Sequence, residues 1–151
     1  MVVMRQEVKM MDPQGLYETL VGRVGADRVL LATTAAAERE LVPQVAMAVG
    51  HSLPETLLED PGALEVFACS FSGVGHLDLE RYRSAGVAVT NAAGVHAVNI
   101  TEHVIGAMLY FSRGFDTAVR QQRAARWAPF MPGELAGTEA VVVGMGAIGT
   151  R

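Results

Sequence analysis

The chain has 151 residues, of which 50% are hydrophobic and 19% are charged, a composition typical of a globular domain with its own core. Its net charge of −4 and the absence of a basic cluster argue against a nucleic-acid-binding protein. The apolar run at residues 104–112 is far too short to span a membrane. We therefore expect a globular protein without nucleic-acid or membrane partners.

The N-terminal stretch carries charged residues at positions 5, 7, 9 and 12, so it lacks the continuous apolar segment of a signal peptide. The one cysteine, Cys69, cannot form an internal disulfide, which fits a reducing compartment. These two features predict a cytoplasmic protein. We assign no metal site.

Short apolar runs alternate with helix-like stretches between residues 28 and 91. The predicted strands are Arg28–Thr33, Val45–Gly50, Ala63–Ser70 and Val87–Asn91, and the predicted helices are Thr34–Gln44, Leu53–Asp60 and Leu77–Gly86. Pro43 interrupts the first of these helices, and a glycine ends the third. Strands that alternate with helices predict a parallel sheet in an α/β fold.

A longer helical pattern occupies residues 99–127, where apolar side chains recur every three to four positions. Asn99 followed by Glu102 is typical of a capping box, with the asparagine as the cap. Gly114 is expected to end or kink the helix. The stretch Ala128–Leu135 is rich in proline and glycine and is interpreted as a linker.

A glycine turn follows the apolar run "AVVVG" near the end of the chain. Gly144, Gly146 and Gly149 form the pattern G-x-G-x-x-G directly after this predicted strand. The first glycine permits a tight turn, the second allows the backbone to approach a pyrophosphate, and the third lets a helix pack closely. The pattern favours dinucleotide binding, with N–H groups at residues 146–148 facing the phosphates. An ordinary tight turn is the alternative. The acidic ribose ligand expected about 20 residues later would lie beyond residue 151.

Three stretches together resemble one enzyme family. "FSGVGHLDLERYRSAGVAVTN" is followed by "GVHAVNITEHVIGAMLYFSRG" and then by "ELAGTEAVVVGMGAIGTR". In this order and spacing they resemble the D-isomer-specific 2-hydroxyacid dehydrogenases, the group that contains glyoxylate and hydroxypyruvate reductases. The resemblance runs from about Ala63 to the end. It implies a flavodoxin-like substrate domain interrupted by a Rossmann domain, an active site in the cleft between them, and a homodimer.

The resemblance assigns substrate binding to Ser72, Gly73 and Val74, whose backbone N–H groups match the family loop that binds the substrate carboxylate. A glycine after a strand also allows successive amides to converge on an anion, although a plain turn between strand and helix is the alternative. Gly75 departs from the aspartate common in the family, which predicts a looser loop. His96 matches a position that faces the substrate, with a surface histidine as the alternative.

The resemblance also assigns cofactor binding. Ile100 and Thr101 match residues near the nicotinamide, and the implied NAD or NADP site comprises Thr101, Gly144, Gly146, Ala147, Ile148 and Gly149. Glu102 is interpreted as a cap and domain-interface residue rather than an acid catalyst. His76 and His103 are interpreted as structural or surface residues, and His51 carries no functional signal.

The family reaction needs an arginine that clamps the carboxylate and a histidine–carboxylate pair that transfers a proton. In relatives all three follow the glycine turn, and no residue of this chain matches them. We therefore expect an N-terminal half with no catalytic residue of its own. The expected segments are 1–100, the first part of the substrate domain; 101–133, an interdomain helix and linker; and 134–151, the first strand and glycine turn of a Rossmann domain.

The complete protein is accordingly expected to reduce small 2-keto acids such as glyoxylate, hydroxypyruvate or pyruvate. One alternative is a non-catalytic module that pairs with relatives through its exposed helix. Another is a different Rossmann enzyme, such as a relative of homocysteine hydrolase, against which the loop at residues 72–78 argues. The sequence leaves open the particular 2-hydroxy acid and the choice between NAD and NADP.

Overall fold

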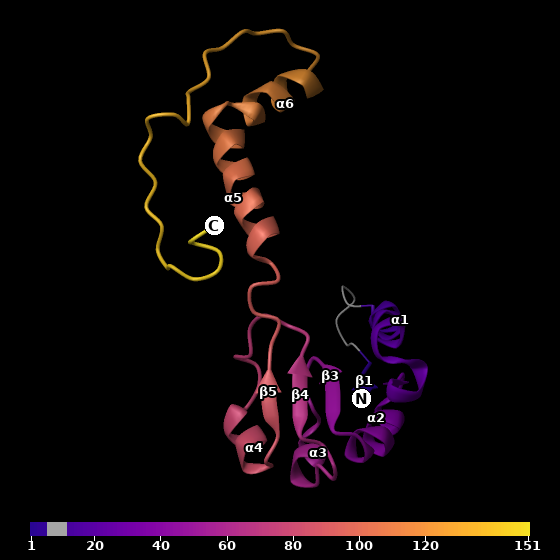
Figure 1. Cartoon of the computed structure of the whole chain (residues 1–151). Coiled ribbons are helices and arrows are strands. Elements are labelled where there is room, and N and C mark those ends of the chain that lie inside the picture. Colours follow the sequence, from indigo (N-terminus) through magenta and orange to yellow (C-terminus); the bar gives the residue numbers. More distant parts are fainter. Residues whose placement is uncertain (6–11) are drawn as a thin grey trace. The chain divides into compact units, whose positions relative to one another are not determined.

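A computed structural model describes residues 1–5 and 12–151 of the chain (Figure 1). The chain divides into two compact units, Met1–Ala93 and Gly94–Arg151. The assignment of segments 1–100, 101–133 and 134–151 to parts of two enzyme domains stays a prediction.

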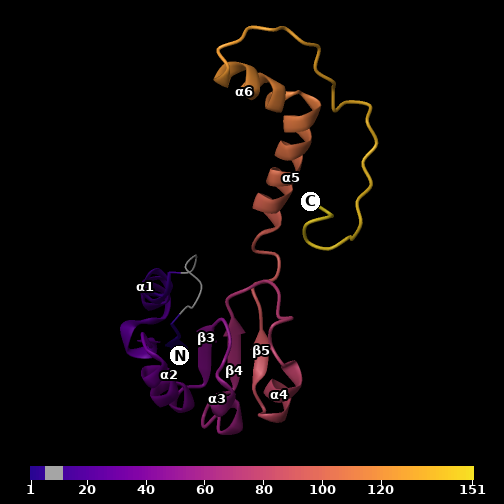
Figure 2. The ribbon, with the colours of Figure 1, turned by 180° about the vertical axis from the view of Figure 1, so that it is seen from behind.

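The first unit is built on a sheet of five parallel strands in the order β2-β1-β3-β4-β5. The strands are β1 (Val2–Val3), β2 (Leu30–Leu31), β3 (Met47–Gly50), β4 (Val66–Cys69) and β5 (Ala88–Thr90). This strand order is that of the flavodoxin-like folds, so the predicted α/β fold is confirmed. Figure 2 shows β3, β4 and β5 side by side from behind.

Helices connect these strands. They are α1 (Pro13–Val24), α2 (Ala35–Leu41), α3 (Glu55–Glu59) and α4 (Leu79–Ser84), with short 3-10 turns at Ala26–Arg28 and Val42–Gln44. The predicted interruption at Pro43 is confirmed, because α2 ends at Leu41 and Pro43 lies in the 3-10 turn. Gly86 ends the α4 segment with a φ of 74°, a conformation that glycine adopts without strain.

Neither β1 nor α1 was predicted from the sequence. Strand β1 is only two residues long, but it pairs with both β2 and β3, and Val2 and Val3 are completely buried. Its strand character comes from these two neighbours rather than from its own pattern. Helix α1 begins after Asp12, whose side chain accepts a hydrogen bond from the Gln14 N–H at 3.1 Å.

The core lies along the centre of the sheet, where Phe67 of β4 is completely buried. Tyr82 of α4 packs against it, with ring centroids 5.5 Å apart. The Tyr82 hydroxyl accepts a hydrogen bond from the backbone N–H of Leu53 at 2.9 Å. Burial raises the pKa of the Tyr82 hydroxyl above its usual value of 10.0. This bond joins α4 to the segment that follows β3.

The second unit contains two helices, α5 (Ala97–Ser112) and α6 (Phe115–Arg123). Gly114 separates them with a φ of 66°, as the sequence predicted. The predicted capping box is wrong: α5 begins at Ala97 after His96, so Asn99 and Glu102 lie inside the helix and Glu102 is not a cap. The Asn99 side chain bonds only to the N–H of the next residue, at 3.1 Å.

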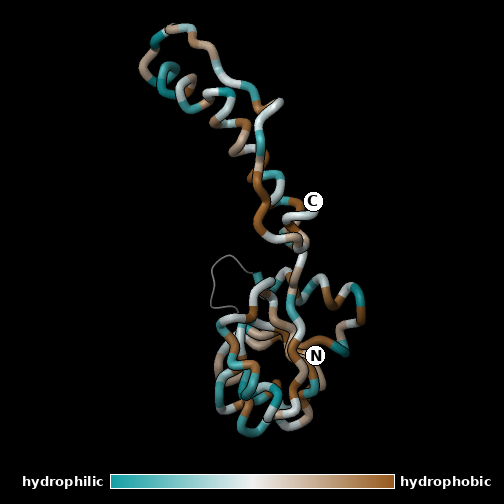
Figure 3. Tube along the Cα trace, turned by 90° about the vertical axis from the view of Figure 1, so that its left-hand side faces the viewer, coloured by the Kyte–Doolittle hydropathy of each residue, from teal (hydrophilic) through white to brown (hydrophobic). Residues whose placement is uncertain are grey.

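The second unit has almost no core. Of its residues only Ala97 is buried, and apolar side chains of α5 remain exposed on several sides of the helix. Figure 3 shows the hydrophobic residues along the trace of the chain. A helix that is apolar all round is normally covered by other elements. None of the described helices has the length and apolar character needed to cross a membrane.

Residues 128–143, which include the predicted linker and the predicted last strand, form neither a helix nor a strand. Val141, Val142 and Val143 are 83%, 59% and 96% exposed. A parallel strand of this type requires paired neighbours and covered faces. Residues 141–143 therefore form no strand, since no segment of residues 1–5 and 12–151 pairs with them.

Changing Tyr82 to phenylalanine should destabilise the first unit by about 1–3 kcal/mol, because the N–H of Leu53, which is only 7% exposed, loses its acceptor. Urea unfolding would measure this loss.

The folded state also holds the Tyr82 proton to higher pH than the unfolded state. The contribution of the Tyr82 hydroxyl to the free energy of unfolding is therefore complete below pH ~10 and falls as the pH rises further. Tyr82→Phe should lack this alkaline decrease. The matched control is Tyr110→Phe, at a tyrosine that is 39% exposed; equal losses in both variants would contradict the prediction.

Hydrogen exchange on the 151-residue polypeptide should show strong protection in β3 and β4 and almost none at Val141–Val143. The central strands are paired on both sides, whereas the valines are exposed and outside any strand. Sedimentation would establish that the sample is monomeric, since exposed apolar segments invite association. Slow exchange at Val141–Val143 in a monomer would mean that this segment pairs within the chain.

Candidate functional site

The carboxyl ends of the parallel strands bring three segments of the first unit to one edge of the sheet. They are His51 after β3, the loop 70–76 after β4, and Asn91 after β5. Ligands of open α/β sheets bind outside this edge. The predicted substrate-binding residues Ser72, Gly73 and Val74 lie in the middle one of these segments.

Hydrogen bonds hold the start of the loop from both sides. On the β3 side, the N–H and the hydroxyl of Ser70 donate to the Gly50 carbonyl at 2.8 and 3.0 Å. On the β5 side, the N–H of Ala92 donates to the Phe71 carbonyl at 3.0 Å, and the side-chain amide of Asn91 donates to the Ser72 carbonyl at 2.7 Å. The loop is therefore fixed by its neighbours in the sheet.

Two histidines secure the end of the loop. The Nε2 of His76 donates to the His51 carbonyl at 3.0 Å, and the two rings meet edge to face with centroids 4.2 Å apart. The ring of Phe71 packs against the ring of His51, with centroids 4.7 Å apart. The sequence assigned His51 no role and His76 only a structural or surface one. Their contact could not be read from the sequence, since they lie 25 residues apart and come together only through the pairing of β3 with β4.

The backbone N–H groups of Ser72, Gly73 and Val74 donate to no acceptor in the part of the chain that the structure describes. Gly73 is exposed, and a Cβ placed on it would meet no atom within 4 Å. Its backbone also lies outside the left-handed region. Neither backbone conformation nor crowding within the chain requires a glycine here. The three amides are available to an anion.

A small cavity of about 280 Å³ lies at the carboxyl ends of β1 and β3. Glu38 of α2 lines it and is only 2% exposed. Its carboxylate accepts hydrogen bonds from the Arg5 backbone N–H at 3.0 Å and from Arg5 Nε at 3.2 Å. This buried carboxylate could not be predicted from the sequence, because "AAAERE" has the pattern of an exposed helix.

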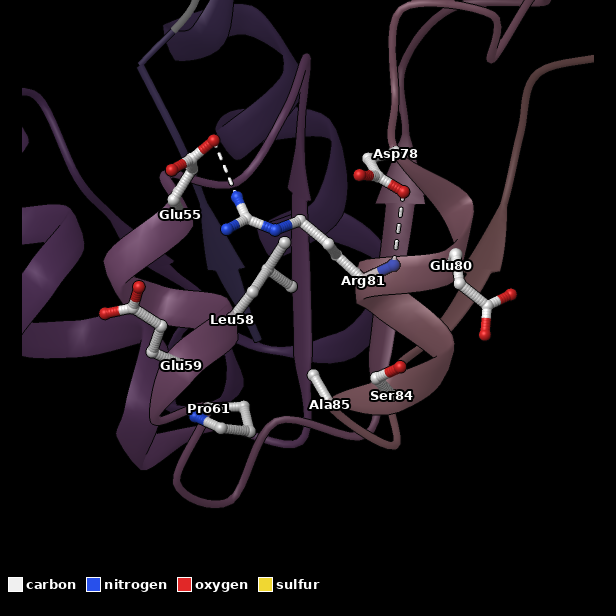
Figure 4. Close-up of a pocket in the computed structure, with 9 residues that line it drawn as sticks. All are labelled: Glu55, Leu58, Glu59, Pro61, Asp78, Glu80, Arg81, Ser84 and Ala85. Atoms are coloured by element: carbon white, nitrogen blue, oxygen red, sulfur yellow. Dashed lines mark hydrogen bonds and ion pairs between the residues drawn. The ribbon is translucent and has the colours of Figure 1, made fainter.

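A larger groove of about 480 Å³ lies between α3 and α4 (Figure 4). Its charged side chains include Glu59, Asp78 and Glu80 together with an ion pair in which Arg81 contacts Glu55 at 2.6 Å. The hydrogen bond that Arg81 donates to the Glu55 carboxylate raises the pKa of the Arg81 guanidinium. No group of three or more potential metal ligands occurs among the described residues, so this acidic groove is not assigned as a site.

The three glycines of the turn in the second unit differ in backbone conformation and in the space around their Cα atoms. Gly144 has a φ of 106°, which favours glycine. A Cβ at Gly146 would meet nothing within 4 Å, whereas a Cβ at Gly149 would collide with the Gly144 carbonyl oxygen. The N–H of Thr150 donates to the Gly146 carbonyl at 3.1 Å, as in the first turn of a helix. These features fit a phosphate-binding turn.

The remaining predicted residues also lie in the second unit. The Thr101 hydroxyl lies 3.4 Å from the Ile148 carbonyl and donates to the Ala97 carbonyl at 2.7 Å, so it contacts the glycine turn. Ile100 is 38% exposed. His96 precedes α5, is exposed, and makes no capping hydrogen bond through its side chain.

Comparison with known proteins decides the family. Residues 16–148 match the family described as D-isomer specific 2-hydroxyacid dehydrogenase, catalytic domain. The chain belongs to this family. The glyoxylate/hydroxypyruvate reductase HPR3 of Arabidopsis thaliana is 27% identical over 111 residues, which cover 70% of this chain and 34% of the reductase.

Solved structures support the fold. D-2-hydroxyisocaproate dehydrogenase superposes with a TM-score of 0.78 at 16% identity, over 99% of this chain and 48% of that enzyme. The NADPH-dependent glyoxylate/hydroxypyruvate reductase of Sinorhizobium meliloti gives a TM-score of 0.72 at 24% identity, over 99% and 47%. The chain thus spans about a third of the Arabidopsis reductase and about half of these two enzymes.

Proposed function

We propose that the complete protein is an oxidoreductase that reduces small 2-keto acids to D-2-hydroxy acids with NAD(P)H. Its family membership and its similarity to the Arabidopsis reductase support the general chemistry. The observation that carries the proposal is the loop at the end of β4, where three successive backbone amides are not used by the described fold. A small anion such as a carboxylate matches three such donors.

In this proposal the first unit binds the substrate by its carboxylate. The N–H groups of Ser72, Gly73 and Val74 donate to the carboxylate oxygens, and the missing side chain of Gly73 leaves room for close approach. The hydrogen bonds to Asn91 and Ala92 hold the loop before the substrate arrives. A site that is ordered in advance loses less entropy on binding. His96 would contact the rest of the substrate and influence which keto acid is preferred.

The second unit would hold the dinucleotide. The open position at Gly146 and the N–H groups of Ala147 and Ile148 would face the pyrophosphate, with Thr101 near the nicotinamide. The bound nicotinamide supplies the hydride for carbonyl reduction. The Sinorhizobium reductase is described as NADPH-dependent, and a Staphylococcus aureus formate dehydrogenase of similar fold is described as NAD-dependent. We propose that the cofactor is NAD or NADP.

The arginine that clamps the carboxylate and the histidine–carboxylate pair that transfers the proton are proposed to lie outside these 151 residues. Segment 1–100 would then be the first part of the substrate domain, 101–133 the interdomain helix and linker, and 134–151 the start of the Rossmann domain. We also propose a cytoplasmic homodimer, in which the exposed apolar side chains of α5 would be covered.

A non-catalytic interaction module is the second candidate. The exposed apolar side chains of α5 favour it, because such surfaces often bind partners. The two functions can be separated by reading the DNA after codon 151. A continuing frame that encodes the missing arginine and histidine supports the enzyme, and an immediate stop codon supports the module.

Changing Gly73 to valine in the complete protein should raise the KM for the keto acid about tenfold or more, because the side chain blocks the approach of the carboxylate to the amides. The KM for the cofactor should change less than about twofold. Gly75→Val is the matched control, since Gly75 lies in the same loop with equally open surroundings. Steady-state kinetics would measure these constants. If the keto-acid KM of Gly73→Val stays within about twofold of the wild type, the loop is not the carboxylate site.

The 151-residue polypeptide alone should not oxidise NADH or NADPH in the presence of glyoxylate, hydroxypyruvate or pyruvate, because no proton donor or arginine clamp has been assigned within it. The absorbance of the reduced nicotinamide should stay at the level of the blank. Turnover that copurifies with the polypeptide through two chromatography steps would contradict this prediction.

A further inference from the structure

The peptide bond between Ser72 and Gly73 is held by a side chain rather than by the sheet. The carbonyl of Ser72 accepts a hydrogen bond from the Asn91 side-chain amide at 2.7 Å, one of the shortest polar contacts in the first unit. The preceding peptide bond is held differently, since the Phe71 carbonyl accepts from the backbone N–H of Ala92 at 3.0 Å. Two neighbouring carbonyls are thus fixed from the segment that follows β5.

Fixing a carbonyl also fixes an N–H group. A trans peptide is planar, and its C=O and N–H point in opposite directions. The bond from Asn91 to the Ser72 carbonyl therefore directs the Gly73 N–H away from Asn91. In the same way, the bond from Ala92 to the Phe71 carbonyl directs the Ser72 N–H. Two of the three amides assigned to the substrate carboxylate owe their direction to contacts with residues 91 and 92.

We propose that Asn91 is a positioning residue of the substrate site, whose side-chain amide holds the Ser72–Gly73 peptide so that the Gly73 N–H stays directed at the substrate carboxylate. This inference rests on the proposed function of the loop. Asn91 acts through the Ser72 carbonyl and does not itself contact the substrate.

The chemistry of Asn91 suits this task. A carbonyl oxygen requires a donor, which the amide nitrogen provides without adding charge beside an anion site. The amide oxygen of Asn91 lies 3.4 Å from the N–H of Ala93, an arrangement that agrees with the nitrogen facing Ser72. Aspartate at this position would present oxygen to oxygen and would repel a carboxylate. Asn91 is exposed, so its bond to Ser72 serves the loop rather than the core.

Changing Asn91 to alanine in the complete protein should raise the KM for glyoxylate about tenfold, with kcat within about twofold of the wild type, because a carboxylate contact shared by ground state and transition state is weakened. The exposed position means that the truncation leaves no cavity. Thermal unfolding of the variant should match that of the wild type and would verify its folding.

The matched control is His76→Phe. It removes a hydrogen bond of comparable length from the same loop, 3.0 Å to the His51 carbonyl, and preserves an aromatic ring at that position. It does not touch the carbonyls of Phe71 and Ser72. Its KM for glyoxylate should therefore rise far less than that of Asn91→Ala. An equal rise of KM in both variants would show that only the general order of the loop matters and would overturn the proposal.

A second measurement separates this proposal from the proposed reaction. Formate or glyoxylate is titrated into the isotopically labelled 151-residue chain, and the amide resonances of Ser72 and Gly73 are followed. The amide resonance of Gly73 should shift when the anion is added to the wild type. In Asn91→Ala the shift should be at least about fivefold smaller, because the amides of Ser72 and Val74 alone bind the anion less tightly. Failure of the complete wild-type protein to reduce any keto acid would refute the proposed reaction, while the titration would still decide the role of Asn91. An unchanged Gly73 response in the variant would overturn that role.

Discussion

Parallel pairing of β3 with β4 places Gly50 directly beside Cys69 at the carboxyl edge of the sheet. The backbone bond from Ser70 to the Gly50 carbonyl extends this pairing by one residue, and the contact between His76 and the His51 carbonyl extends it into the loop. The loop after β4 is therefore an extension of the sheet. Its geometry, and every chemical property assigned to its amides, depends on the register of these two strands.

The same edge explains how residues proposed to bind the substrate can lie in a loop and still have fixed positions. The carbonyls of Phe71 and Ser72 are occupied by donors from the segment after β5, and the adjacent N–H groups have no acceptor in the described part of the chain. When the carbonyl groups of successive peptides accept hydrogen bonds on one side, their free N–H groups point to the other side, where they can donate to an anion. A rigid scaffold that carries such a loop is a common arrangement in ligand-binding proteins.

The two units differ in how much of their apolar surface they bury. The first unit covers Val2, Val3 and Phe67 completely, whereas the second buries only Ala97 and leaves the valines of residues 141–143 exposed. Each exposed valine forgoes about 1.5–3 kcal/mol of burial. The glycine turn proposed to bind the dinucleotide is thus present without the sheet that would normally support the strand before it. The turn keeps its backbone conformation without a sheet, whereas residues 141–143 need neighbouring strands to form a strand.

The sequence by itself determined the features that depend on neighbouring residues. The alternation of apolar runs and helices predicted the parallel α/β fold, Pro43 and Gly86 marked real helix ends, and Gly144, Gly146 and Gly149 gave a turn with the expected backbone features. Only the tertiary structure decided that Val2–Val3 is a central strand, that α5 begins at Ala97, and that residues 141–143 form no strand. It also decided that Asn91, predicted only as the end of a strand, bonds to the Ser72 carbonyl 19 residues earlier. These features depend on partners distant in the sequence, and a local pattern carries no information about which partner a strand or side chain will meet.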